Sequence, residues 1–264
     1  MRIRRGYRRG SAIAMRSGAP ARPFRLVVAL VLLFAGGAEI PAAEFRIDEA
    51  ESVLAVLTHR AGLAARLAHN HLVAASRYSL EAQFDPAHPA KASVSFSTNV
   101  ADLVVDDPGL HGEWYPRLEA LGLLDEPFKE LSEKDRRKIR GSMLGKSQLY
   151  AEAHPRIECR VREIRERATS LGDTTFPFHA TLELTIRGRT VSRAVPARYS
   201  HDGRSLKIET VGVFRFTEFG FEPYSAMLGA VKNRDEFHVF ASLTLETANP
   251  ETPAPRADDP ETVK

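Results

Sequence analysis

The feature that most constrains this chain is a long run of alternating apolar and polar residues between positions 174 and 246. Residues 180–186 and 237–245 alternate almost without interruption, and the turns at 187–190 and 201–204 each contain a glycine. A period of two sends successive side chains to opposite faces of a strand, which suits antiparallel pairing with one buried face. Short strands joined in series by such turns are typical of a β-barrel or sandwich. The run therefore predicts an all-β fold.

The residues before this run predict further strands of the same kind. Positions 78–84 and 92–100 both alternate, the second more regularly than any other part of the chain. Residues 53–57 are apolar on both faces, so the register of that strand cannot be taken from the pattern. In a charged strand at 156–167, Ile164 is out of phase with the alternating apolar residues Ile157, Cys159 and Val161. This shift predicts a bulge near Arg162. We predict one antiparallel barrel of about eight strands, interrupted by one helix.

Residues 106–131 break the alternation. The segment holds many large apolar side chains without a regular period, among them Trp114, Leu118 and Phe128, and its aromatic content argues against disorder. Ser132 then predicts a helix N-cap, and the helix would run to about Ser147 with Ile139 and Met143 on its apolar side. Because exposed apolar patches of this size are rare on soluble monomers, we expect the segment to fold over one barrel mouth with Trp114 and Phe128 as the plug, held there by the helix. An exposed surface that docks on a membrane or a partner is the alternative.

The two ends of the chain predict processing and disorder rather than fold. Residues 1–43 place an arginine-rich lead before an apolar run at 26–35 and end in small residues. This order is typical of a signal peptide, so we expect export to the periplasm or beyond after cleavage near Glu44. An uncleaved membrane anchor is the alternative. Residues 250–264 are rich in proline, threonine and charge and predict a disordered tail, which leaves one domain at 44–249.

The charge of the predicted mature chain argues against a nucleic-acid partner. The whole chain has a formal net charge of +3, but residues 1–43 hold eight Arg and one Glu. The remainder therefore carries 29 basic and 33 acidic residues, a net charge of −4. A domain that binds nucleic acid usually presents a basic surface.

The sequence contains no standard catalytic motif, phosphate-binding loop or paired-cysteine metal site. Cys159 is its only cysteine and is expected to be a small buried apolar residue. His69 and His71 are the sharpest polar feature, because residues two apart on an extended backbone point to the same side. Three interpretations stay open: hydrogen-bonded histidines at a barrel rim, a grip on the polar head of a ligand, and half of a metal site.

Four short stretches resemble one known family. The hairpin of the YceI-like family is resembled by Leu184-Thr-Ile-Arg-Gly-Arg-Thr190. Other motifs of the family are resembled by Phe45-Arg-Ile-Asp48, Ala153-His-Pro-Arg-Ile157 and Glu218-Phe-Gly-Phe221, and all four stretches occur along the chain in the family's order. A subset of the family has Gly-His-Asp-His where this chain has Ala68 to His71, and the loss of that Asp weakens the metal interpretation. The resemblance implies a secreted lipocalin-like barrel that binds a long isoprenoid or similar amphiphile.

Together these observations predict a binding protein that is not an enzyme and has no cofactor. We expect an exported carrier of an isoprenoid lipid or quinone-like amphiphile, with transient membrane contact left open. A metal-binding protein or metal-dependent enzyme centred on the two histidines is the rival hypothesis. We predict that the ligand is bound by apolar inward-facing strand residues, by the loop at 219–229, by the two histidines and by Trp114. The predicted ligand-binding residues are Phe84, Val94, Phe96, Leu182, Leu184, Phe214, His69, His71, Phe219, Tyr224, Met227 and Trp114.

Overall fold

The computed structural model describes residues 43–85, 88–124 and 126–247. The chain divides into two units, Met1–Ile40 and Pro41–Lys264, and all described residues belong to the second. The predicted signal peptide, up to residue 42, and the predicted tail lie outside the described residues. Among the residues described, no helix is long and apolar enough to cross a membrane.

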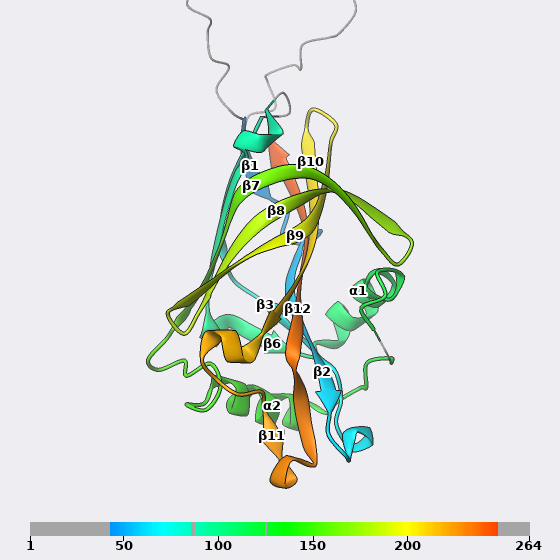
Figure 1. Cartoon of the computed structure of the whole chain (residues 1–264), viewed down its shortest axis with the longest axis vertical. Helices are drawn as coiled ribbons and strands as arrows, with labels where there is room; N and C mark the ends of the chain where they lie inside the picture. The colour runs from blue at the N-terminus through cyan, green and yellow to red at the C-terminus, as the bar shows by residue number, and fades with distance from the viewer. Residues whose placement is uncertain (1–42, 86–87, 125, 248–264) are drawn as a thin grey trace, which may run out of the picture. The chain divides into compact units, whose positions relative to one another are not determined.

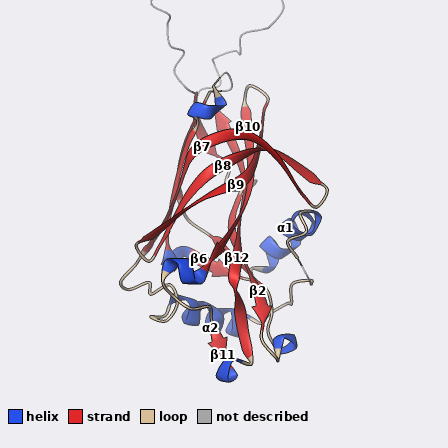
Figure 2. Cartoon of the chain, viewed as in Figure 1, coloured by secondary structure: helices blue, strands red, loops and turns tan. Residues whose placement is uncertain are grey.

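One antiparallel sheet makes up most of the domain (Figures 1 and 2). Two α-helices follow β6, namely α1 (Pro108–Ala120) and α2 (Glu133–Leu144), where we predicted only one. Within the described ranges, five short 3₁₀ helices lie between the strands: η1 (Ala65–Leu67), η2 (Pro89–Lys91), η3 (Val100–Asp102), η4 (Phe216–Phe219) and η5 (Met227–Gly229). The strands are β1 (Ala43–Ile47), β2 (Val53–Ala61), β3 (His71–Ala75), β4 (Ser79–Phe84), β5 (Ser93–Asn99), β6 (Leu103–Val105), β7 (Arg156–Leu171), β8 (Thr174–Ile186), β9 (Arg189–His201), β10 (Ser205–Arg215), β11 (Ser225–Ala226) and β12 (Val231–Thr247).

The pairing of these strands closes a ring. Neighbours run β1-β4-β5-β7-β8-β9-β10-β12, and β12 pairs back onto β1. β1 and β2 lie one after the other along β12, since Phe45 pairs with Thr247 and Val53 with Ser242. β3 continues β4 in the same way, and β6 continues β5. Apart from β11, which adds to β12, the segments thus fill eight antiparallel positions around the ring, which confirms the barrel prediction, although the described residues form twelve strands where we predicted about eight. The predicted bulge is also present, as a register shift between Val161 and Ile164.

Helix α1 begins where we expected irregular chain. Asp107 caps it by accepting hydrogen bonds from the backbone N–H groups of Gly109 and Leu110, and Pro108 occupies its first turn, where a missing N–H does no harm. Its buried Leu118 packs with Leu57 of β2 and Phe240 of β12. The side chains of Leu57 and Phe240 point away from the barrel interior, so α1 covers the outside of the barrel.

Helix α2 confirms the helix predicted after Ser132. The Ser132 hydroxyl accepts a hydrogen bond from the Asp135 backbone N–H at 3.2 Å, and the helix ends at Leu144. Ile139 and Met143 pack against the cluster that holds Val73 of β3 and Leu103 of β6, which face into the barrel. The segment that covers the interior is therefore α2, and not the stretch that carries Trp114.

The inward faces of the strands form two zones. In the zone around β1, β4 and the ends of β10 and β12, closely packed side chains fill the interior: the buried members are Phe45, Ala82, Phe84, Ala92, Leu206, Ala241, Leu243 and Leu245. Phe84 and Tyr199 meet edge to face there, with ring centroids 4.9 Å apart. We call this zone the packed half of the barrel.

Candidate functional site

The other half of the barrel interior contains a cavity of about 620 Å³. We call it the hollow half. Its walls are inward-facing side chains of the sheet, among them Val56, Val73, Phe96, Leu103, Leu182, Leu184, Ile186 and Val239. Its cover consists of residues from α2 and from the segments around η4, among them Ile139, Met143, Leu149, Phe216 and Phe221. The lining is therefore mostly aliphatic and aromatic, which suits an apolar ligand.

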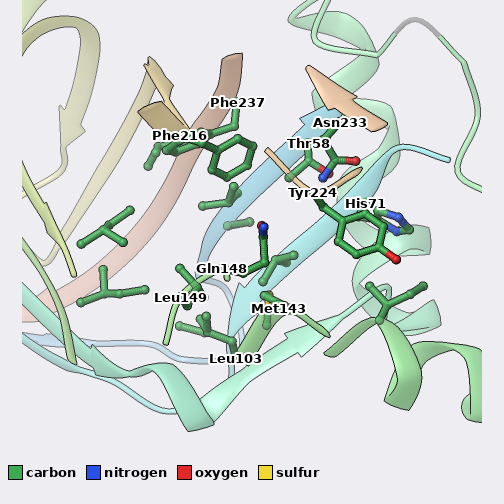
Figure 3. Close-up of a pocket in the computed structure, with 18 of the residues that line it drawn as sticks. Thr58, His71, Leu103, Met143, Gln148, Leu149, Phe216, Tyr224, Asn233 and Phe237 are labelled. Atoms are coloured by element: carbon green, nitrogen blue, oxygen red, sulfur yellow. The ribbon is translucent and has the colours of Figure 1, made fainter. Parts of the chain in front are cut away.

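Polar side chains gather on one side of this cavity. Figure 3 shows Thr58, His71, Tyr224 and Asn233 together there, with Leu103 and Leu149 elsewhere on the lining. Thr58 and His71 are paired in register on β2 and β3, so their side chains leave the sheet on the same face. We call these four residues the polar corner.

Thr58 carries an unused hydrogen-bonding group. The residue is 7% exposed, and its buried Oγ1 has no hydrogen-bond partner among the described residues. An unsatisfied buried hydroxyl costs about 1–3 kcal/mol. Because Thr58 lines the cavity, a polar group of a bound molecule could satisfy it.

His71 is held by a buried carboxylate. Its Nδ1 lies 2.7 Å from Asp106 Oδ2, and the second oxygen, Oδ1, accepts from the Leu72 backbone N–H at 2.9 Å and faces His111 Nε2 at 3.3 Å. Burial alone would raise the pKa of Asp106, but the hydrogen bonds from His111 and His71 outweigh it and hold that pKa below its ordinary value. The ionised carboxylate can only accept, so His71 Nδ1 donates and Nε2 is the nitrogen available to a molecule in the cavity.

Helix α2, which covers the cavity, is also hydrogen-bonded to Asp106. Arg136 of α2 donates a hydrogen bond to the backbone carbonyl of Asp106 at 3.4 Å, and Arg140 donates to that of Leu103 at 2.9 Å. Asp106 itself has a left-handed backbone, with φ of 49°. The loop between β6 and α1 thus positions His71 and anchors α2 through one residue.

Two of the other titratable groups that line the cavity have shifted pKa values. Burial lowers the pKa of His69, and the nearby positive charges of Lys129 and His71 lower it further, so its neutral form is favoured. Burial raises the pKa of the Cys159 thiol to about 12, which keeps it protonated and unreactive at neutral pH. Within the ranges described, no group of three or more His, Cys, Asp or Glu side chains is arranged to hold a metal ion.

The predicted site residues fall into distinct groups. Six line the cavity: Phe96, Leu182, Leu184, His69, His71 and Tyr224. Phe84 and Val94 face inward but belong to the packed half, and Phe214 and Phe219 lie in a neighbouring buried cluster with Phe237. Met227 is exposed. Contact of any of these residues with a ligand stays a prediction.

Trp114 is not the plug that we expected. It lies on α1, on the outside of the barrel, with its ring centroid 5.9 Å from that of Phe240. Phe128 stacks on His111, with ring centroids 4.2 Å apart. The physical reason is that the segment forms a capped helix whose apolar side matches the outward apolar face of β2, a face that the sequence pattern could not assign.

Sequence reasoning missed Thr58, Asp106 and Asn233. The Thr58–His71 pair depends on the register of β2, which its uniformly apolar sequence hides. Asp106 stands beside Asp107 in the sequence, and nothing local separates the buried carboxylate from the helix cap. Asn233 follows a turn whose path is set by its hydrogen bond to the Tyr224 carbonyl, 2.9 Å from the Asn233 backbone nitrogen.

Residues 45–245 match the model of the YceI-like domain. The chain belongs to the YceI-like family. The match spans all of the barrel except the ends of β1 and β12, and it confirms the resemblance of the four sequence motifs.

Three solved structures are similar to this YceI-like chain, and the first of them, with a TM-score above 0.5, has the same fold. The crystal structure of Burkholderia cenocepacia BcnA has a TM-score of 0.51 at 17% identity, covering 75% of this chain and 99% of that chain. A polyisoprenoid binding domain from Saccharophagus degradans, implicated in plant cell wall breakdown, has a TM-score of 0.45 at 6% identity, covering 78% and 99%. The Campylobacter jejuni YCEI protein has a TM-score of 0.43 at 11% identity, covering 67% and 85%. The comparison with curated proteins gave no match.

Proposed function

We propose that this protein is a non-enzymatic carrier that holds an isoprenoid lipid or quinone-like amphiphile in the hollow half of its barrel. The observation that carries the proposal is a mostly apolar cavity of about 620 Å³ in which Thr58, His71, Tyr224 and Asn233 lie together on one side. Each CH₂ group of an apolar tail costs roughly 0.8 kcal/mol when left in water, so moving the tail into this cavity gives a large gain. Membership of the YceI-like family supports the isoprenoid class of tail.

The polar corner supports a head group that forms hydrogen bonds. Thr58 Oγ1 needs a partner, and His71 lines the cavity and is held through Nδ1 by Asp106, which leaves Nε2 free to accept a hydrogen bond. A hydroxyl at the end of an apolar tail could accept from Thr58 and donate to His71 Nε2, and a carbonyl could accept from the Thr58 hydroxyl. Asp106 acts through His71 and is a positioning residue.

The proposed carrier works outside the cytoplasm. The arginine-rich, apolar and small-residue order of positions 1–43 supports export followed by cleavage near Glu44. Intact-mass measurement of the exported protein tests this step. A mass that retains residues 26–43 would favour the membrane anchor instead.

Solvent extraction and mass spectrometry of the purified protein test the function. We expect an isoprenoid or quinone-like molecule in the extract, in amounts close to one per chain. The same preparation should be analysed for metals. Extracts without lipid, together with stoichiometric zinc or copper that disappears when His69 and His71 are both changed to Ala, would replace the carrier with the metal hypothesis.

A further inference from the structure

Three large apolar side chains stand exposed at one end of the barrel domain. Leu63 and Leu228 have relative exposures of 103% and 109%, and Met227 is 66% exposed. They lie on two neighbouring loops, because the Ala64 backbone N–H donates to the Ala230 carbonyl at 2.9 Å. Figure 1 shows β11 and the adjoining ends of β2 and β12 at this end of the domain. We call Leu63, Met227 and Leu228 the tip.

The backbone at the tip is strained for the residues that it carries. Met227 and Leu228 have φ angles of 51° and 54°, and Gly229 follows with 88°. The left-handed region favours Gly and Asn, and bulky apolar residues adopt it only at a cost. Neither side chain gains burial within the described domain in return. A strained turn that holds apolar side chains out in water indicates a partner that buries them.

The surroundings of the tip are basic. Residues 60–68 and 222–234 contain Arg60, Arg66, Lys232 and Arg234 but only one acid, Glu222, although residues 44–264 as a whole have a net charge of −4. Arg60 pairs with Glu126. Arg66 and Lys232 are exposed and form no ion pair within the part of the chain that the structure describes. Cations around exposed apolar side chains match a surface that is both apolar and negatively charged.

We propose that the tip inserts into the headgroup region of an anionic phospholipid bilayer. Met227 and Leu228 of the tip form the turn of the β11–β12 hairpin, whose base lines the cavity, since the Asn233 backbone N–H donates to the Tyr224 carbonyl at 2.9 Å and both residues line the cavity. Docking by the tip therefore brings the polar corner close to the bilayer surface. The purpose of the contact, loading and release of the amphiphile, rests on the carrier function proposed above, but the contact itself does not.

Flotation with vesicles tests the proposal. The full gene product, as the cell processes it, is mixed with vesicles of phosphatidylglycerol and phosphatidylethanolamine or of phosphatidylcholine alone. We expect binding to the first kind that weakens as salt is added, and weaker binding to the second. The variant L63S/M227N/L228N should bind the anionic vesicles about tenfold less or worse, because the inserted apolar area is gone. Both proteins have the same N-terminus, so a difference between them comes from the tip.

Two controls separate the tip from folding and from general stickiness. Asn suits left-handed positions, so the triple variant should melt no lower than wild type. V213S removes an exposed apolar side chain of β10, 37% exposed, and should leave vesicle binding unchanged. R66E/K232E should weaken binding to anionic vesicles only.

The outcomes are distinguishable from those for the carrier function. Vesicle binding that is equal in wild type and the triple variant, or absent from wild type, overturns the tip proposal even if lipid co-purifies. Loss of a dimer in the triple variant, with no vesicle binding by wild type, would assign the tip to self-association instead. If wild type binds vesicles through the tip but never contains lipid, the tip proposal stands and the carrier function fails.

Discussion

The packed half and the hollow half of this barrel are built from the same strands, yet only one of them is filled. Along β12 the inward positions run from Val239, which lines the cavity, to Leu243 and Leu245, which are buried in the packed half. In the packed half the rings of Phe45 and Phe84 meet the aliphatic side chains of Leu206 and Leu245. In the hollow half Val, Thr and Ala occupy many inward positions, and α2 covers the space without filling it.

The difference shows how one barrel can separate stability from binding. An eight-stranded barrel is just wide enough to be filled by side chains or to hold one small ligand. Here one half supplies the close-packed core that keeps the ring closed, and the other half keeps a mostly apolar cavity with the polar corner on one side. Mutations of equal size should therefore have unequal effects in the two halves.

The largest expected effect is the loss of a ring from the packed half. F84A should lower the free energy of unfolding by about 3–5 kcal/mol, because Phe84 is buried against Tyr199 and His201. F96A, on the paired strand but lining the cavity, should cost about half of that or less, since part of its surface already faces empty space. Urea unfolding of both variants measures the difference. Equal losses would contradict the division into two halves.

The next largest effect comes from adding a ring to each half. L243F should destabilise the protein by about 1–3 kcal/mol, because it overfills a close-packed region. V239F, four residues earlier on the same face of the same strand, has a cavity to enter and should change stability by less than about 1 kcal/mol. Thermal unfolding provides the comparison. A V239F protein that is destabilised as much as L243F would show that the cavity closes in solution.

Removal of the Asp106 carboxylate should lower the free energy of unfolding by an amount that depends on pH. The folded state lowers the pKa of Asp106 below its ordinary value of 3.8, so its contribution to stability is complete above about pH 5 and is lost as the pH falls through 3.8 and below. Asn tolerates the left-handed backbone of Asp106, so D106N removes mainly the charge. We expect D106N to cost about 1–3 kcal/mol at pH 7 and much less near pH 3.

Urea unfolding of D106N and wild type at several pH values measures this difference. A constant difference from pH 7 to pH 3 would mean that the ionised carboxylate does not stabilise the fold.

The smallest effect on stability is expected at the polar corner. T58V removes a hydroxyl without a partner, so the protein should be unchanged or up to about 1 kcal/mol more stable. It should nevertheless retain less co-purified amphiphile. T98V is the matched control, because Thr98 also lines the cavity but its hydroxyl donates to the Arg77 carbonyl at 2.6 Å. T98V should be destabilised, and a T58V protein that keeps all of its lipid would remove Thr58 from the head-group site.

The sequence predicted the barrel architecture better than it predicted which part of the interior is packed and which part is hollow. The alternation at 180–186 and 237–245, the cap at Ser132 and the bulge near Arg162 were all local signals, and the structure confirms each. Helix α1 had a local signal as well, Asp107 followed by Pro108, but its weak periodicity concealed it.

The site needed information that no local pattern contains. Phe84, Val94 and Phe96 share one alternating phase, and only their depth along the barrel decides that two belong to the packed half and one to the cavity. The pairing of Thr58 with His71 depends on a strand register, and the contact of His71 with Asp106 joins residues 35 positions apart. His69 and His71 were found from sequence because spacing alone put them on one side.

Native mass spectrometry of the wild-type protein beside V239F is the most direct test of the central claim that the hollow half holds the amphiphile. The account predicts that wild type carries one additional small molecule per chain, which solvent extraction removes, and that V239F is folded and carries none. Wild-type protein at its bare polypeptide mass, or V239F with the same bound molecule in the same amount, would contradict it.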